Sequence, residues 1–492
     1  MSSASPPGTK PERRSPTRRP ALAWTLTALS LSTLLPSLST SIANVGLPSI
    51  AVAVGASFNE VQWVVIAYLL AITTLIVGAG RLGDIAGRRR LLLSGIAVFT
   101  LATLLCGLAT NLPLLAAARA VQGAGAACMM ALSMAFVSET VPKDRIGSVM
   151  GLLGTMSAVG TTLGPSLGGL LIAGFGWRAI FLVGVPLGLL ALALTIRALP
   201  ASAPATGPAP HRFDSLGTVL LAITLAAYAL AMTIDGKPFG PLAIALLVAA
   251  VAGLGLFVIT ESRVASPLLT LSMLRDPVLA TGLMTSALVS TVMMTTLVVG
   301  PFHLARSLDL NPTYVGLVMS AGPAVAALTG VPAGRATDRF GSQALVIIGL
   351  GGVIGGSVVL SLMPTATGVA GYILPLVAVS ASYATFQAAN NTAVMKDIAP
   401  HQRGLVSGML NLSRNLGLIT GASVMGAVFT LAAGTSDITT AAPEHVARGT
   451  HRTFAATALL VAAGLAAVLV LRLRSRLSSG RSTMPSFPLH DQ

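Results

Sequence analysis

Charge is scarce in this sequence. Of its 492 residues only 9% are Asp, Glu, Lys or Arg, whereas soluble globular proteins carry about 25%. So few charges cannot cover a water-exposed surface, which excludes a cytosolic enzyme and a disordered scaffold. Only two cysteines occur, Cys106 and Cys128, both within apolar runs, which excludes a disulfide framework and a cysteine metal site. No G-x-x-x-x-G-K-[ST] motif occurs, so an ATP-driven pump is excluded; we expect no cofactor and no metal.

Long apolar runs are present instead. Hydrophobic residues make up 54% of the chain, with 51 glycines and 29 prolines, which transmembrane helices tolerate. A helix needs about 20 apolar residues to cross a bilayer core. The sequence therefore predicts an all-α polytopic membrane protein with fourteen transmembrane helices, over residues 21–48, 61–81, 91–110, 113–138, 147–174, 178–199, 215–234, 241–260, 278–302, 313–334, 344–363, 369–394, 404–433 and 453–472.

The cations decide the orientation of these helices. Most of the 30 lysines and arginines fall in the N-terminal tail, in the loops after even-numbered spans and in the C-terminal tail. This bias predicts that both termini are cytoplasmic, in a multi-pass protein of the cell membrane. Orientation in the membrane also accounts for the net charge of +15, so nucleic acid is not needed to explain it and the bilayer is the expected partner.

Two segments of the sequence resemble each other. In GRLGDIAGRRR (80–90) and GRATDRFGSQ (334–343), glycine, arginine and aspartate recur at matching positions, and the glycines of 151–169 recur in 408–426. Transporters are built from such repeats, with the substrate site between them. The predicted organisation is a tail (1–20), a six-helix bundle (21–200), a linker (201–214), two inserted helices (215–260), a loop (261–277), a second six-helix bundle (278–472) and a tail (473–492). The two inserted helices carry few polar groups and are expected to pack against lipid.

Several motifs together resemble one family. They are GRLGDIAGRRR, RAVQGAG (119–125), GTTLGPSLGG (160–169) and WRAIFLVGVPLG (177–188), with QWVVIAYLL (62–70) and NLSRNLG (411–417) in support. From about 21 to 472 the chain resembles the major facilitator superfamily, specifically its fourteen-helix drug:proton antiporter branch. The resemblance implies a transporter rather than an enzyme.

The repeated loop is a candidate conformational gate. The resemblance implies that Asp84 contacts the opposite half of the protein near a helix N-terminus, where a carboxylate is stabilised by the helix dipole. The alternative is an ordinary basic loop at the inner membrane face. The candidate gate residues are Gly80, Arg81, Asp84, Gly87, Arg88, Arg335 and Asp338.

Two arginines lie inside predicted spans. An arginine there costs at least about 2.5–3.5 kcal/mol on insertion, so it normally faces a bundle interior or a cavity. The resemblance gives Arg119 a role in proton coupling, with Gln122 as its hydrogen-bonding neighbour, and the same reasoning applies to Arg414. The alternative is a structural arginine that binds backbone carbonyls or reaches the interface.

Small residues form a candidate packing motif in the fifth span. Small side chains let helices approach closely, and Pro165 permits a kink. The resemblance makes this segment the antiporter signature, a pliable face between the halves; ordinary glycine-mediated packing is the alternative. The motif residues are Gly160, Gly164, Pro165, Gly168 and Gly169.

An expected carboxylate is absent. Members of the branch typically carry an acid in the first span, where this chain has Ser39, and no Asp or Glu occurs in the middle of any predicted span. Proton coupling would normally use such an acid. The histidines His303 and His401 lie near span ends and are expected at the interfaces. Residues predicted for the substrate cavity are Asn44, Tyr68, Tyr383, Gln387 and Asn391.

These features predict a secondary transporter that works by alternating access. We expect proton-coupled efflux of small lipophilic compounds, with a cavity that favours neutral or anionic substrates because its charges are arginines. The alternative is an uncoupled or differently coupled exporter of a metabolite or organic anion. A channel fits the two-half repeat less well, and a sensor without transport is a more distant alternative. The protein is expected to act as a monomer.

Overall fold

The structure is a computed structural model that describes residues 18–140, 146–199, 214–233, 240–264, 271–396, 398, 403–435 and 438–481. All regular elements in these residues are helical, and fourteen helical segments are long and apolar enough to cross a membrane. The N-terminal half contains α1 (Arg18–Val54), α2 (Phe58–Val61), α3 (Trp63–Ala86), α4 (Arg88–Leu108), α5 (Leu112–Thr140), α6 (Ile146–Phe175), α7 (Ala179–Leu182) and α8 (Gly184–Ala198).

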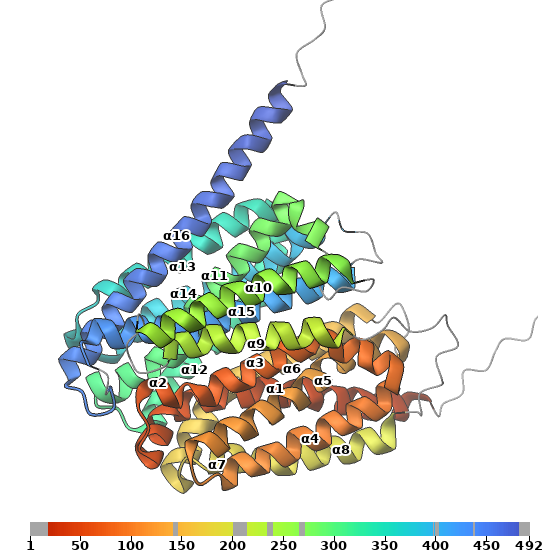
Figure 1. Cartoon of the computed structure of the whole chain (residues 1–492), viewed down its shortest axis with the longest axis horizontal. Coiled ribbons are helices and arrows are strands. Elements are labelled where there is room, and N and C mark those ends of the chain that lie inside the picture. The colour runs from red at the N-terminus through yellow and green to blue at the C-terminus, as the bar shows by residue number, and fades with distance from the viewer. Residues whose placement is uncertain are drawn as a thin grey trace, which may run out of the picture.

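The remaining elements follow α8 in the chain. An intervening pair is formed by α9 (Ser215–Thr233) and α10 (Pro241–Arg263). The C-terminal half contains η2 (Leu271–Arg275), α11 (Pro277–Phe302), η3 (His303–Ser307), α12 (Pro312–Phe340), α13 (Ser342–Leu362), η4 (Thr365–Thr367), α14 (Gly368–Met395), α15 (Arg403–Ala433) and α16 (Pro443–Arg481). Figure 1 shows the two halves one above the other, with α9 and α10 drawn across their junction.

The helix bundle has two ends, one marked by Gly87 and the other by Phe58. Successive spans run in opposite directions, so the turns at Gly87 and Gly341 lie at the same end, the Gly87 end. Both glycines have positive φ, 90° and 86°, and each joins two helices without an intervening loop. Only glycine adopts this conformation readily, which explains its recurrence in the repeated motif. The opposite end, which carries α2, is the Phe58 end.

Several expected spans begin or end elsewhere. The second starts three residues earlier, at Phe58, because Ser57 and Glu60 form a capping box that begins α2. Gln62, which keeps right-handed helical dihedral angles, separates α2 from α3. The sixth expected span is divided into α7 and α8, and α16 extends beyond the expected 453–472 at both ends. Charged and polar residues at the ends of these helices hid their full length from a hydropathy criterion.

The two halves are each held together by the same glycine contact. A Cβ placed on Gly160 of α6 would lie 2.6 Å from the carbonyl oxygen of Leu34 in α1, and one on Gly417 of α15 would meet the carbonyl oxygen of Ala287 in α11. The hydroxyl of Ser41 donates to the Gly160 carbonyl at 3.2 Å, as that of Thr291 does to the Gly417 carbonyl at 3.1 Å. The repeat in the sequence therefore corresponds to a repeated packing contact.

Several contacts between the halves lie at the Phe58 end. The ring of Phe58 in α2 packs edge-on against Phe302 of α11 at 4.7 Å and Phe429 of α15 at 5.1 Å between centroids. Nearby, Gly169 of α6 lies against Gly316 of α12. These contacts close the Phe58 end of the molecule.

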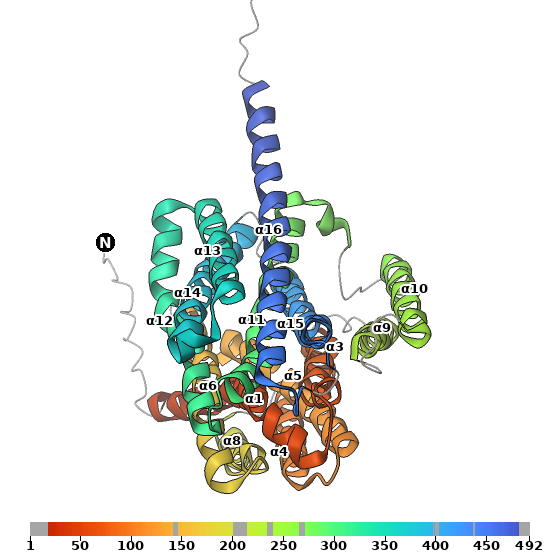
Figure 2. The same ribbon diagram turned by 90° about the vertical axis from the view of Figure 1, so that its left-hand side faces the viewer.

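The inserted pair α9–α10 corrects one expectation. Figure 2 shows α10 on the outside and α9 between it and α3. Whereas one face of α10 is exposed, α9 packs against α3 and α15, one helix from each half, and buries Leu221 and Leu225. Only α10 therefore matches the expected lipid-facing packing; α9 spans the junction of the two halves.

Candidate functional site

Arg119 of α5 lies at the centre of a polar cluster in the N-terminal half. Its side chain is fully buried, about 10 Å along the helix axis from the start of α5. The Nε–H group donates to the carbonyl oxygen of Val64 at 2.7 Å, and Nη1 donates to Ser39 Oγ at 2.8 Å and to Gln122 Oε1. The amide of Gln122 in turn donates to Thr103 Oγ1 at 2.6 Å. Four helices, α1, α3, α4 and α5, thus supply the cluster.

Aromatic rings cover the guanidinium group. Its carbon lies 4.1 Å from the ring centroid of Tyr68 and 5.9 Å from that of Phe181, both within the range of cation–π attraction. The Tyr68 hydroxyl donates to the carbonyl oxygen of Pro36 at 2.9 Å, which fixes the ring. Arg119 is therefore enclosed inside the N-terminal half and does not line a cavity between the halves.

The cluster holds a cation without an acid. No Asp or Glu of the described ranges hydrogen-bonds to Arg119, and its Nη2 atom is buried without a hydrogen-bond partner there. Ser39 Oγ stands where Nη1 would meet a carboxylate. A hydrogen bond from a charged donor to a neutral oxygen compensates buried charge less well than one to a carboxylate. The departure noted in the sequence thus has a direct geometric consequence.

The packing motif of α6 presents two faces. Gly160, Gly164 and Gly168, spaced four apart, all face α1; a Cβ on Gly164 would lie 2.8 Å from the amide nitrogen of Ile42. Pro165 and Gly169 face α12 instead. A Cβ on Gly169 would lie 3.1 Å from the Cα atom of Gly316 and would meet the carbonyl oxygen of Pro312.

One helix face thus holds the N-terminal half together and the next face meets the other half. The sequence motif did not reveal Gly316, the partner in α12. The feature of the sequence that could have indicated this contact is a pair of small residues, Gly316 and Ser320, spaced four apart in the expected span.

The candidate gate residues occupy the Gly87 end. Arg335 and Asp338 are exposed, and a Cβ placed on Gly80 or Gly334 would meet no atom within 4 Å. The side chains of Arg81 and Asp84 lie outside what the structure describes, so the predicted contact of Asp84 with the opposite half stays a prediction. Other members of the loop are nearby: Gly87 forms the turn, and Arg88 begins α4.

A second polar cluster lies in the C-terminal half, toward the Gly87 end. Gln387 and Asn391 of α14 and Arg414 of α15 line one pocket of about 160 Å³, together with Met395, Leu410 and Asn411. Arg414 is half-buried and forms no ion pair with a described residue. The pocket therefore offers one cation and several amides to a ligand. Asn411 was not singled out from the sequence, although it opens the NLSRNLG segment.

The structure separates the other predicted cavity residues. Tyr68 belongs to the Arg119 cluster, and Asn44 is buried in α1, where its amide donates to the Thr40 carbonyl at 2.8 Å. Tyr383 is half-buried on α14, one turn before Gln387, and does not line the polar pocket. Residues four apart lie on the same face of a helix, so Tyr383 and Gln387 differ in depth along α14 rather than in direction.

His303 lies near the end of its span, as expected, but is buried within the protein. It is only 6% exposed and stacks on Tyr372, with 5.6 Å between the ring centroids. The π-helical turn η3 that follows α11 extends the helix and carries the imidazole inward. His401 lies outside the described residues.

Comparisons with known proteins agree with this arrangement. The family model for the Major Facilitator Superfamily matches residues 29–422. The chain is 32% identical over 428 residues to the drug efflux pump JefA of Mycobacterium tuberculosis, covering 82% of this chain and 80% of that protein. It is 27% identical over 404 residues to the riboflavin transporter RibZ of Clostridioides difficile, covering 82% and 87%.

A solved structure shares the fold. A bacterial homolog of the human lysosomal transporter Spinster, in its inward-facing and unoccupied conformation, superposes with a TM-score of 0.68 over 92% of this chain and 97% of that one. The two sequences are 15% identical, so this likeness concerns the fold alone.

Proposed function

Because the chain belongs to the Major Facilitator Superfamily and is a multi-pass membrane transporter, we propose that it exports small lipophilic compounds in exchange for protons by alternating access. Among its relatives are a drug efflux pump and a multidrug resistance protein of Mycobacterium tuberculosis. The Gly87 end faces the cytoplasm, and so do both termini, in agreement with the distribution of lysine and arginine.

One observation supports the proposed cycle. Phe58, Phe302 and Phe429 close one end of the molecule, while the pocket of Gln387, Asn391 and Arg414 lies toward the other. A substrate that enters from the Gly87 end would meet this pocket first. Release then requires the contacts at the Phe58 end to part, as alternating access demands.

The chemistry of the polar pocket supports a preference among substrates. Its one charged side chain is Arg414, and no described carboxylate lines it. Coulomb attraction in a low-dielectric interior therefore favours neutral or anionic compounds over cations.

A second candidate function is favoured by the Arg119 cluster. Without an acid at position 39, Arg119 has no described carboxylate to exchange protons with. Export of a metabolite or organic anion, uncoupled or coupled to another ion, would fit this arrangement. The riboflavin transporter among the relatives shows that metabolite carriers occur at this degree of similarity.

Everted membrane vesicles acidified inside and containing a pH-sensitive dye distinguish the two functions. Neutral, anionic and cationic compounds are added in turn, and vesicles without the protein serve as the control. Proton-coupled export predicts that neutral or anionic compounds dissipate the proton gradient only when the protein is present. If compounds move while the gradient is unchanged, the second function replaces the first. If neither compounds nor protons move, both proposed functions are wrong.

A further inference from the structure

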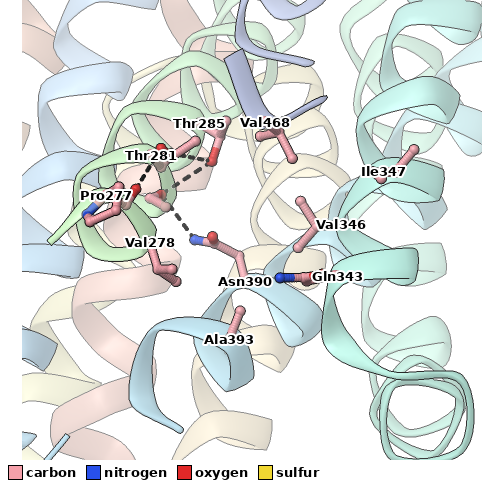
Figure 3. A pocket seen from close by; sticks show the side chains of 11 residues that line it. Pro277, Val278, Thr281, Thr285, Gln343, Val346, Ile347, Asn390, Ala393 and Val468 are labelled. Atoms are coloured by element: carbon pink, nitrogen blue, oxygen red, sulfur yellow. Dashed lines mark hydrogen bonds between the residues drawn. The ribbon is translucent and has the colours of Figure 1, made fainter. Parts of the chain in front are cut away.

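A second pocket, of about 170 Å³, lies inside the C-terminal half. It is bounded by α11, α13, α14 and α16, as Figure 3 shows. On α14 it is lined by Asn390 and Ala393, whereas Gln387 and Asn391 of the same helix line the polar pocket. The two pockets are therefore separate and share α14 as a wall.

Apart from Gln343, the polar side chains of this pocket, called here the lipophilic pocket, donate hydrogen bonds to the protein itself. The hydroxyl of Thr281 donates to the Pro277 carbonyl at 2.6 Å, and that of Thr285 donates to the Thr281 carbonyl at 2.8 Å. The Asn390 amide donates to the carbonyl oxygen of Gly282 at 3.1 Å, across the pocket wall (Figure 3).

No lining residue is titratable. An ion placed here would lose its hydration and find no opposite charge, so the lining suits a neutral, apolar ligand.

The lipophilic pocket lies at the depth of one leaflet. Its residues on α11 run from Pro277 to Thr285, within about 12 Å of the start of that helix. At its rim Val278 is 51% exposed, and the Gln343 side chain is exposed too. A molecule dissolved in the leaflet at the Gly87 end can therefore reach it without entering water, and the Gln343 amide is available to a single polar substituent.

The size limits the ligand. A protein cavity of about 150 Å³ lined by apolar side chains accommodates benzene. The lipophilic pocket is slightly larger and has Val346, Ile347 and Val468 on its walls. It fits one or two fused rings, and it is too small for a whole drug-sized molecule, whose pockets measure about 300–1,000 Å³.

We propose that this pocket binds neutral one- or two-ring compounds that arrive from the lipid, and that it is a membrane-side site separate from the polar pocket. The proposal rests on the proposed export of lipophilic compounds, since it gives such compounds a place in the protein before they reach the polar pocket. The wall that joins the two is α14, through the neighbouring residues Asn390 and Asn391.

The test uses the full-length protein in nanodiscs of phosphatidylethanolamine and phosphatidylglycerol, with a radiolabelled naphthyl diazirine as the photoprobe. Light-induced labelling should fall on peptides of α11 and α13 and should be displaced by excess naphthalene. Val346→Phe fills the pocket and should lower this labelling at least tenfold. Ile348→Phe, on the same helix but pointing to lipid, adds a similar volume and should leave labelling unchanged.

Three results would overturn the proposal: labelling that naphthalene does not displace, labelling equal in the two variants, or labelling of these peptides by an acyl-chain photolipid that naphthalene cannot compete away. The last would make the pocket a lipid site. Displacement by naphthalene in the unmodified protein tests the site even if Val346→Phe does not fold. Because no gradient is involved, failure here is distinguishable from failure of proton exchange in vesicles.

Discussion

The indole Nε1–H of Trp63 in α3 donates a hydrogen bond to Thr233 Oγ1 in α9, with 3.0 Å between the two atoms. Earlier in α9, the Tyr228 hydroxyl donates to Thr420 Oγ1 of α15 at 3.1 Å. The helix α9 is thus hydrogen-bonded to both halves, which move relative to one another in the proposed alternating-access cycle. In that cycle, α9 would restrain the movement of the two halves.

Replacing either donor should ease the movement of the halves. Trp63→Phe and Tyr228→Phe each remove one hydrogen bond, worth about 0.5–1.5 kcal/mol. If movement of the halves limits transport, each variant should transport about two- to tenfold faster. Initial rates of efflux from vesicles measure this. Trp24→Phe and Tyr314→Phe, at exposed positions, are the controls and should not change the rate. Equal rates in all four variants would show that α9 exerts no restraint.

A methyl group at the junction of α6 and α12 should force the halves apart at the Phe58 end. In Gly169→Ala and Gly316→Ala the new Cβ would overlap backbone atoms of the opposite helix. We expect faster hydrogen exchange in residues 58–66 and a loss of transport of at least tenfold.

Two glycines of the same helices provide matched controls. A Cβ on Gly174 or Gly330 would meet no atom within 4 Å, so Gly174→Ala and Gly330→Ala should behave like the unmodified protein. Normal exchange and transport in Gly169→Ala would contradict the proposed role of this contact.

An acid at position 39 should stabilise the Arg119 cluster. In Ser39→Asp a carboxylate takes the place of the hydroxyl that accepts from Nη1 at 2.8 Å. Hydrogen bonds to charged groups contribute about 1.5–3 kcal/mol against about 1 kcal/mol for neutral pairs. The melting temperature in detergent should therefore rise at pH 7, and proton movement per substrate should increase in vesicles.

Ser39→Asn separates charge from size in that experiment. It introduces a side chain of nearly the same shape without the negative charge, so it should neither raise the melting temperature nor increase proton movement. A similar effect of both substitutions would mean that charge at position 39 is irrelevant.

Arg414 should set the charge preference of the polar pocket. Arg414→Gln removes its one cationic lining residue, so transport of anionic compounds should fall at least tenfold, equivalent to about 1.4 kcal/mol, while that of neutral compounds is kept. Efflux of a matched acid and its methyl ester measures the difference. Arg452→Gln, at an exposed position of α16, is the control. An equal loss for acid and ester would indicate a structural role for Arg414.

The sequence predicts the number and type of helices well, because apolar runs of sufficient length have few other structures in a membrane. It predicts their ends less well. The start of α2 depends on a capping box of two polar side chains, Ser57 and Glu60, and hydropathy treats both as loop residues. Similarly, the polar residues at the start of α16 concealed almost three turns of helix.

An arginine inside a span is expected to have a functional or a structural role, but the sequence does not show which way the side chain of Arg119 points. Its enclosure depends on Tyr68 and Phe181, which are far apart in the chain and which nothing in the sequence pairs with Arg119. The close approach of Gly169 and Gly316 likewise requires knowledge of which helices meet. Gln387, Asn391 and Arg414 were each singled out from the sequence, yet only the folded chain shows that they share one pocket while Asn44 and Tyr68 lie elsewhere.

The enclosure of Arg119 also has a consequence for biogenesis. A single α5 helix in lipid would expose the guanidinium at a cost of about 2.5–3.5 kcal/mol. Its acceptors, Ser39 and the Val64 carbonyl, belong to α1 and α3, which leave the ribosome earlier. If these helices remain beside the insertion machinery until α5 arrives, the charge enters the membrane already hydrogen-bonded. We therefore expect the N-terminal half to insert as a group of helices rather than one span at a time.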